Sequence, residues 1–194
     1  MSAPADTSCV FMDGPWTHRF VQANGCQFHL AHMGEHRDDR PLVVLVHGYP
    51  EYWWAWRHQL EPIAAAGYEV AAIDQRGIAG SDKTHDIGAI ARSLGASRVV
   101  VVGHGRGGSL AWATPTLDPN LVEGIVTFSA PHTRTLQRVG THLTLHTWRH
   151  VADTFIPPLA RRAIKADNYV KKLLVEWSAR GNDGAASQAP LYAA

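Results

Sequence analysis

Short runs of β-branched and other apolar residues recur along this chain, and a segment with helical spacing follows most of them. The runs are PLVVLVHG (41–48), YEVAAID (68–74), SRVVVVG (97–103) and LVEGIVTFSAP (121–131). Strands that alternate with helices form parallel sheets, and such strands are apolar on both faces because helices cover both. The pattern therefore predicts an α/β fold with a mostly parallel sheet.

A hairpin signal precedes these runs. Asn24-Gly25 lies between two short apolar segments and predicts an antiparallel pair of strands at the start of the sheet. The first two predicted helices end at a glycine, and Pro115 limits the third. The predicted helices span 53–67, 85–95 and 107–117, and two further helix-like pieces span 140–152 and 167–178.

Composition is that of an ordinary globular domain, with 45% apolar residues, 18% charged residues and a net charge of +1. This balance gives no indication of a nucleic-acid partner. No apolar run approaches the roughly 18 residues that a spanning helix needs, and the N-terminus lacks the apolar region of a secretory signal. We therefore expect a cytoplasmic protein without a membrane span, in which Cys9 and Cys26 are free thiols.

Three glycine-rich motifs stand where predicted strands end: HGYP (47–50), DQRGIAGSD (74–82) and GHGRGG (103–108). Ligands of open α/β sheets bind at the carboxyl ends of the strands. A strand, a sharp glycine turn and a helix in succession are the layout that presents a catalytic nucleophile. At the corner of that turn stands Gly105, which has no side chain. In the second motif, Asp74 and Arg76 are expected to fix a loop.

These motifs, in this order and at strand ends, resemble the α/β-hydrolase fold family and within it the epoxide hydrolases. The resemblance is carried by VVLVHGYPEYWWAWRHQL, GYEVAAIDQRGIAGSDK, RSLGASRVVVVGHGRGG and SAPH, and it covers roughly residues 20 to 192. It implies the strand order 1-2-4-3-5-6. It also implies a truncated hydrolase core over 1–132, incomplete at its C-terminal edge, and a partial helical cap over 133–194.

The resemblance implies a role for several positions. The family's nucleophile, an Asp, stands where this chain has Gly105, and the backbone N–H groups of Tyr49 and Arg106 match the two donors that stabilise an oxyanion. Tyr192 matches one of the cap tyrosines that polarise an epoxide oxygen, and Tyr169 is the weaker match for the other. The expected binding residues are His47, Pro50, Trp54 and His104, of which His47 more often shapes the turn.

The family's reaction is the opening of an epoxide to a diol through a covalent ester. Its base histidine lies beyond the last strand of a longer chain, and Ser129 occupies the place where the acid can sit in some relatives. We therefore expect an epoxide hydrolase-like protein that is truncated and catalytically impaired, without a cofactor, whose partner is a small apolar epoxide-like molecule. The alternative from a different class is a non-catalytic protein that binds small ligands.

A second alternative is dinucleotide binding, because Gly103, Gly105 and Gly108 form a G-x-G-x-x-G pattern after a strand. Other strands precede this one, and the acidic residue of the fingerprint is missing from the end of the next strand, where Glu123 stands at the start. Both observations count against that alternative.

Two further features concern surfaces. His142, His146 and His150 share one face of a predicted helix, which favours a polar surface over a metal site because no acidic or cysteine ligand accompanies them. The sixth strand is an unprotected sheet edge, so we expect marginal solubility or a homodimer formed through that edge.

Overall fold

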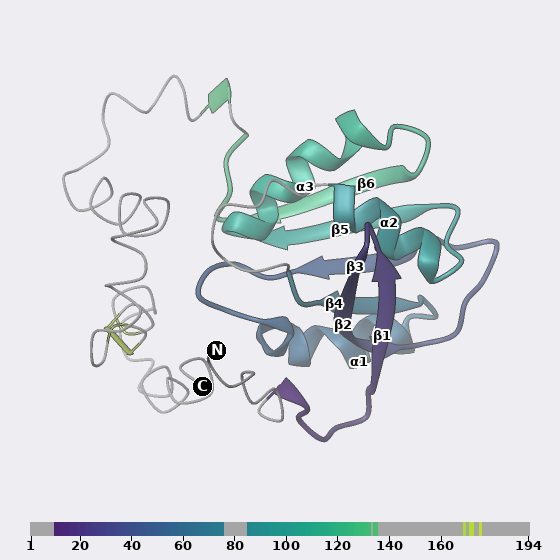
Figure 1. The fold of residues 1–194 in the computed structure, drawn as a ribbon, viewed down its shortest axis with the longest axis horizontal. Helices are drawn as coiled ribbons and strands as arrows, with labels where there is room; N and C mark the ends of the chain where they lie inside the picture. Colours follow the sequence, from purple (N-terminus) through teal and green to yellow (C-terminus); the bar gives the residue numbers. More distant parts are fainter. Residues whose placement is uncertain are drawn as a thin grey trace.

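In the part of the chain that the structure describes, six strands form one mixed sheet in the order β1-β2-β4-β3-β5-β6 (Figure 1), which confirms the predicted fold and strand order. The computed structural model describes residues 10–75, 85–132, 134–135, 169, 171–172 and 175. The strands β3, β4, β5 and β6 run parallel, and β2 joins β4 in antiparallel register. The strands are β1 (Thr17–Ala23), β2 (Cys26–Met33), β3 (Leu42–Val46), β4 (Val70–Ile73), β5 (Val99–His104) and β6 (Val122–Phe128).

The predicted hairpin joins β1 to β2. Asn24 and Gly25 both have positive φ angles, 47° and 70°, which is the requirement of a tight two-residue hairpin turn. Ala23 pairs with Cys26 directly across the turn. The sequence signal at this position therefore identified the turn as well as the two strands.

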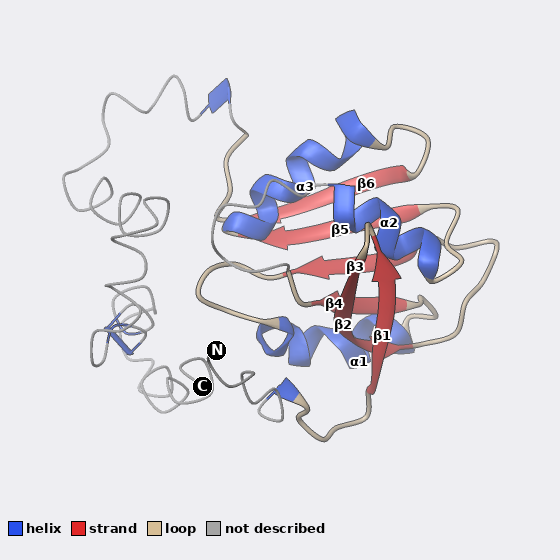
Figure 2. Cartoon of the chain, viewed as in Figure 1, coloured by secondary structure: helices blue, strands red, loops and turns tan. Residues whose placement is uncertain are grey.

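Helices lie on both faces of the sheet (Figure 2). They are η2 (Trp53–Trp56) continuing into α1 (Arg57–Ala65), α2 (His85–Ser93) and α3 (Arg106–Leu117). Gly67 and Gly95 follow α1 and α2 with φ angles of 84° and 87°, as expected of glycines that end helices.

One predicted boundary is confirmed and another needs correction. The helix α3 ends at Leu117 as predicted, and Pro115 lies inside its last turn. A proline removes its own N–H and obstructs the preceding turn, so the turn that contains it can still be completed. The last strand stops at Phe128 instead of continuing to 131, because Ser129 has a φ of 53° and leaves the extended conformation.

Alternate residues of the central strands face two separate cores. Val44 and Val46 point to the core beneath α2 and α3, whereas Val43 and Leu45 point to the core beneath α1. The second core is rich in aromatic rings, and Trp53 at its centre is fully buried. The two cores hold the ends of β3 and β5 in fixed relative positions, and the glycine motifs follow those ends.

Among the described residues, β6 is one edge of the sheet, as the sequence indicated. The predicted helix over 140–152 and its three histidines lie outside these residues, as does most of 167–178. No helix in the described part of the chain is long and apolar enough to cross a membrane.

Candidate functional site

The site is built around the corner between β5 and α3. Gly105 forms this corner with φ 53° and ψ −118°, a conformation that side-chain-bearing residues rarely adopt. Its N–H donates to the carbonyl of Phe128 at 2.9 Å, and its carbonyl accepts from the N–H of Ser109 at 3.2 Å. A Cβ built on Gly105 would have only the Cα of Gly48, at 3.8 Å, within contact range. The corner therefore has the geometry of a nucleophile elbow and open space where the nucleophile would stand.

The neighbouring glycines allow three elements to meet closely. A Cβ on Gly107 would lie 2.1 Å from the carbonyl oxygen of Val46, and one on Gly103 would lie 2.3 Å from the carbonyl oxygen of Gly107. A Cβ on Gly108 would lie 2.4 Å from the Cβ of Ala130. Side chains at these positions would separate α3 from the sheet, so packing alone accounts for the three glycines.

The turn after β3 is fixed by a buried imidazole. The Nδ1 of His47 donates to the carbonyl of Gly48 at 2.7 Å, and its Nε2 accepts the N–H of Gln75 at 3.1 Å. The side-chain amide of Gln75 returns a hydrogen bond to the carbonyl of His47. Burial lowers the pKa of His47 and outweighs the opposing effect of the nearby Asp74 carboxylate. The ring is thus neutral with its hydrogen on Nδ1, which agrees with a role in shaping the turn.

The predicted oxyanion donors follow these two corners. Tyr49 lies in the turn after β3, is buried, and is joined to Pro50 by a cis peptide bond. Arg106 is the first residue of α3, where the backbone N–H groups of the first turn point out of the helix end. The 3.8 Å approach between the Gly48 Cα and the Cβ position of Gly105 brings the two loops together.

The predicted binding residue His104 forms an acid–base pair beside the corner with Glu51, which the sequence did not single out. The Nδ1 of His104 donates to Glu51 Oε2 at 3.3 Å, and the same oxygen accepts the N–H of Gly48 at 3.0 Å. The hydrogen bond with Glu51 raises the pKa of His104 despite partial burial. Burial tends to raise the pKa of Glu51, but the hydrogen bond and charge of His104 outweigh it, so the pKa is lowered. The only sequence signal for Glu51 was its position directly after His-Gly-Tyr-Pro.

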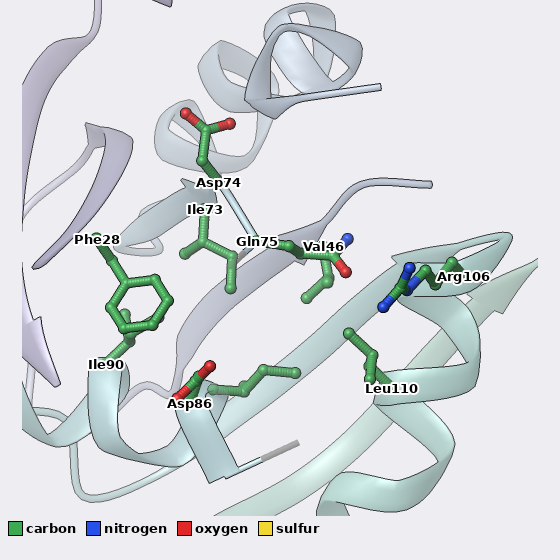
Figure 3. Close-up of a pocket in the computed structure, with 10 residues that line it drawn as sticks. Phe28, Val46, Ile73, Asp74, Gln75, Asp86, Ile90, Arg106 and Leu110 are labelled. Atoms are coloured by element: carbon green, nitrogen blue, oxygen red, sulfur yellow. The ribbon is translucent and has the colours of Figure 1, made fainter. Parts of the chain in front are cut away.

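A small cavity of about 30 Å³ lies on the α2 and α3 side of this region (Figure 3). Figure 3 places Arg106 and Gln75 at one side of it and Phe28 and Ile90 at the other. This volume is about that of one water molecule, so the cavity does not accept an organic ligand.

A larger groove of about 550 Å³ lies on the opposite face, between α1 and the strands β3, β5 and β6. Its walls are mostly apolar, and the Glu51–His104 pair stands among them. Pockets that bind small organic molecules have volumes and linings of this kind. The lining residues are Leu45, Glu51, Ala55, Trp56, Gln59, Ile63, Val102, His104 and Phe128.

The predicted binding residues divide between this groove and the core. His104 lines the groove, whereas His47 lies in the turn described above. Trp54 packs against the ring of Trp16 and beneath the guanidinium of Arg57. The tryptophan that lines the groove is Trp56, two positions further on. A helical spacing of aromatic residues does not distinguish which ring faces a cavity, because the facing surface depends on how the helix is rotated.

The two predicted tyrosines cannot be placed at the site. Tyr192 lies outside the described residues, and Tyr169 is described as a half-buried helical residue. The loop that contains Arg76 also lies outside the described residues. The corner, the turn after β3 and the Glu51–His104 pair are therefore the parts of the site that the structure defines.

Asp74 fixes the loop after β4 through a row of hydrogen bonds. One carboxylate oxygen accepts the N–H of Trp53 at 2.8 Å, and the other accepts from His29 Nδ1 at 2.6 Å. The Nε2 of His29 meets Nδ1 of His18 at 2.8 Å, and Nε2 of His18 meets the carbonyl of Met12 at 2.9 Å. All of these contacts connect structural elements, in agreement with the loop-fixing role expected of Asp74.

A mostly parallel sheet with a glycine corner after β5, a second turn beside it and close-packed helices defines a hydrolase-type α/β protein. Comparison with known families agrees with this description, since the model of the alpha/beta hydrolase fold matches residues 41–170. The chain belongs to the alpha/beta hydrolase fold family.

Its relatives include epoxide hydrolases. The AB hydrolase superfamily protein YfhM of Bacillus subtilis is 32% identical over an alignment of 166 residues, and the match covers 78% of this chain and 57% of that protein. Epoxide hydrolase B of Mycobacterium tuberculosis is 38% identical over an alignment of 126 residues, and the match covers 59% of this chain and 35% of that protein. The chain thus spans about a third to just over half of the length of these relatives.

Solved structures of epoxide hydrolases also align with this chain. An epoxide hydrolase from an endophytic Streptomyces aligns with a TM-score of 0.56 and 29% identity, covering 84% of this chain and 50% of that one. An epoxide hydrolase from Vigna radiata aligns with a TM-score of 0.53 and 32% identity, covering 60% of this chain and 40% of that one.

Proposed function

We propose that this chain binds small apolar epoxide-like molecules and is impaired in opening them. The observation that carries the proposal is the absence of a side chain at Gly105, in an elbow that otherwise has the expected geometry. The names of the relatives supply the substrate class, and the apolar groove beside the corner accommodates a molecule of that class.

The step that Gly105 prevents is the formation of a covalent ester with the epoxide. In the covalent route a carboxylate oxygen attacks an epoxide carbon, the carbon–oxygen bond of the ring breaks, and the ring oxygen takes up a proton. Water then cleaves the resulting ester and restores the carboxylate. Glycine has no oxygen with which to begin this sequence.

The first experiment measures hydrolysis of styrene oxide to its diol by the purified chain, against the same preparation from cells that carry an empty vector. We expect no turnover above the control, and calorimetry is expected to detect binding of styrene oxide. Diol formation above the control would contradict the proposed impairment. Absence of any binding heat would contradict the proposed ligand.

A pair of variants tests the role of the corner. Gly105→Asp restores the family's nucleophile, and Gly105→Asn is its matched control with the same shape and no carboxylate. The open space accepts either side chain, although the positive φ costs about 1–3 kcal/mol. We expect both variants to fold and neither to hydrolyse styrene oxide, because His104, the histidine next to the corner in the described part of the chain, is already hydrogen-bonded to Glu51. Turnover by Gly105→Asp alone would show that a base is present, and His104 would be the nearest candidate.

The dinucleotide alternative has less support. Gly103 and Gly108 approach backbone or Cβ atoms so closely that packing already requires glycine at both positions. The test is fluorescence titration with NAD, for which we expect no saturable change.

A further inference from the structure

The turn between β3 and η2 (residues 47–52, the site turn) is held at both ends by two consecutive residues that follow β4. At the first end, Gln75 donates its backbone N–H to the ring of His47 at 3.1 Å and its side-chain amide to the carbonyl of the same residue. At the other end, Asp74 Oδ1 accepts the N–H of Trp53 at 2.8 Å. The two side chains diverge from the end of β4 (Figure 3). The position of the site turn therefore depends on how Asp74 and Gln75 are placed.

Asp74 supplies from a distance the hydrogen bond that a capping residue supplies locally. The first N–H groups of a helix have no partner within the helix, and a Ser, Thr, Asp or Asn just before the helix commonly accepts one of them. The residue in that place before η2 is Tyr52, whose side chain makes no capping hydrogen bond. The acceptor is instead a carboxylate that lies 21 positions after Trp53. The end of the site turn therefore follows the orientation of the Asp74 carboxylate.

His29 of β2 sets that orientation. Its Nδ1 donates to Asp74 Oδ2 at 2.6 Å, and its carbonyl accepts the backbone N–H of Asp74 at 3.0 Å. A carboxylate that is held by one oxygen alone can rotate, because its terminal torsion has a broad energy profile. With Oδ2 bound to the imidazole, Oδ1 is also fixed and faces the N–H of Trp53. His29 is only 9% exposed, so water competes little for this contact.

We propose that His29 is a positioning residue for the candidate site, although the hydrogen bonds of its ring go to residues outside the site turn. It acts through Asp74 on the end of the turn, and Glu51 lies two residues before that end. The Glu51 Oε2 accepts from His104 Nδ1 at 3.3 Å. This distance exceeds the usual range of about 2.7–3.2 Å, so a displacement of a few tenths of an ångström breaks the pair. The same displacement moves Tyr49, the predicted oxyanion donor.

Two amide variants separate the two contacts of the His29 ring. Asparagine carries its amide nitrogen on Cγ, as histidine carries Nδ1, so His29→Asn retains a donor toward Asp74. Glutamine carries its amide nitrogen one bond further out, so His29→Gln retains a polar group toward His18 and loses the donor toward Asp74. The matched control is His32→Asn. It removes a contact of the same kind at the other end of β4, where His32 Nε2 meets Glu69 at 2.8 Å.

The first readout is the imidazole titration of His104 by NMR, with its signal identified as the one absent from His104→Gln. In the wild type the hydrogen bond with Glu51 raises the pKa of His104. We expect His29→Gln to bring this pKa down toward 6.5, and His29→Asn and His32→Asn to leave it raised. Exchange of the Trp53 amide hydrogen is expected to be about tenfold or more faster in His29→Gln alone. An unchanged His104 titration in His29→Gln, or an equal change in His29→Asn or His32→Asn, would overturn the proposal.

A second measurement extends the test to ligand binding and rests on the proposed function. Glu51 and His104 line the groove, so their displacement changes one of its walls. Calorimetry with styrene oxide is expected to give a dissociation constant about threefold or more higher for His29→Gln than for His32→Asn. Equal dissociation constants would contradict an effect of His29 on the groove. If the wild type binds no styrene oxide, the proposed function fails, and the His104 titration still decides whether His29 positions the site.

Discussion

The close approach of α3 to β3 predicts that a very small substitution at Gly107 destabilises the protein. Gly107 is the second residue of α3, and helix propensity alone would make Gly107→Ala more stable by about 1 kcal/mol. The added Cβ, however, would lie 2.1 Å from the carbonyl oxygen of Val46 and 2.5 Å from that of His47. Both contacts are with backbone, which cannot rotate away.

The expected change in the free energy of unfolding follows from comparing the gain in helix propensity with the cost of the steric overlap. Overpacking a core typically costs about 1–3 kcal/mol, and a backbone overlap of this size lies at the upper end of that range. After subtracting the propensity gain, Gly107→Ala is expected to lose about 2 kcal/mol of unfolding free energy. For a chain of this length the loss lowers the melting temperature by roughly 4–8 °C.

The assay is urea denaturation followed by circular dichroism, comparing transition midpoints at an unchanged slope. The matched control is Ser109→Ala, an exposed position in the same helix, where only the propensity effect applies. We expect a midpoint equal to or slightly above wild type for the control and about 1 M urea below it for Gly107→Ala. A Gly107→Ala midpoint at or above that of wild type would refute the argument that this glycine is required by packing.

Three further predictions concern ionisable groups and the aromatic core. Glu51→Gln is expected to bring the raised pKa of His104 down toward 6.5, as followed by the imidazole proton signals in an NMR titration; an unchanged titration would contradict the pairing. The hydrogen bond with the buried Glu69 raises the pKa of His36 above 6.5. The stability from that contact is therefore complete below pH 6.5 and is lost as the pH rises through the pKa of His36 in the folded protein. The variant His36→Gln should remove this part of the pH dependence of the urea midpoint. Trp53→Phe removes the 2.7 Å hydrogen bond to the carbonyl of Val10 and leaves a void, so it should cost about 2 kcal/mol in the same assay.

The sheet could be predicted because each strand has a characteristic pattern within its own few residues. Four consecutive valines before the glycine motif at 103–108 do not have the spacing of an amphipathic helix, and they indicate the strand that the structure shows as β5. The turn at Asn24-Gly25 required positive φ angles that few other residue pairs accept. Such signals lie within a few residues of the element that they determine.

The site was harder to predict because its contacts join distant segments. Glu51 meets His104 across 53 positions of sequence, and nothing near either residue indicates the other. The rotation of η2, which puts Trp56 and not Trp54 in the groove, depends on packing against the sheet. The end of β6 depends on the φ of Ser129, which the sequence does not mark as glycine would.

The row of contacts from Met12 to Asp74 makes one side chain common to two connections. His18 joins the carbonyl of Met12 to His29, and His29 joins His18 to the Asp74 carboxylate. Because three hydrogen bonds run through only two rings, loss of His29 alone breaks two of them and leaves His18 bound only to the carbonyl of Met12. The side-chain connection between the segment before β1 and the loop after β4 therefore depends on one residue of β2.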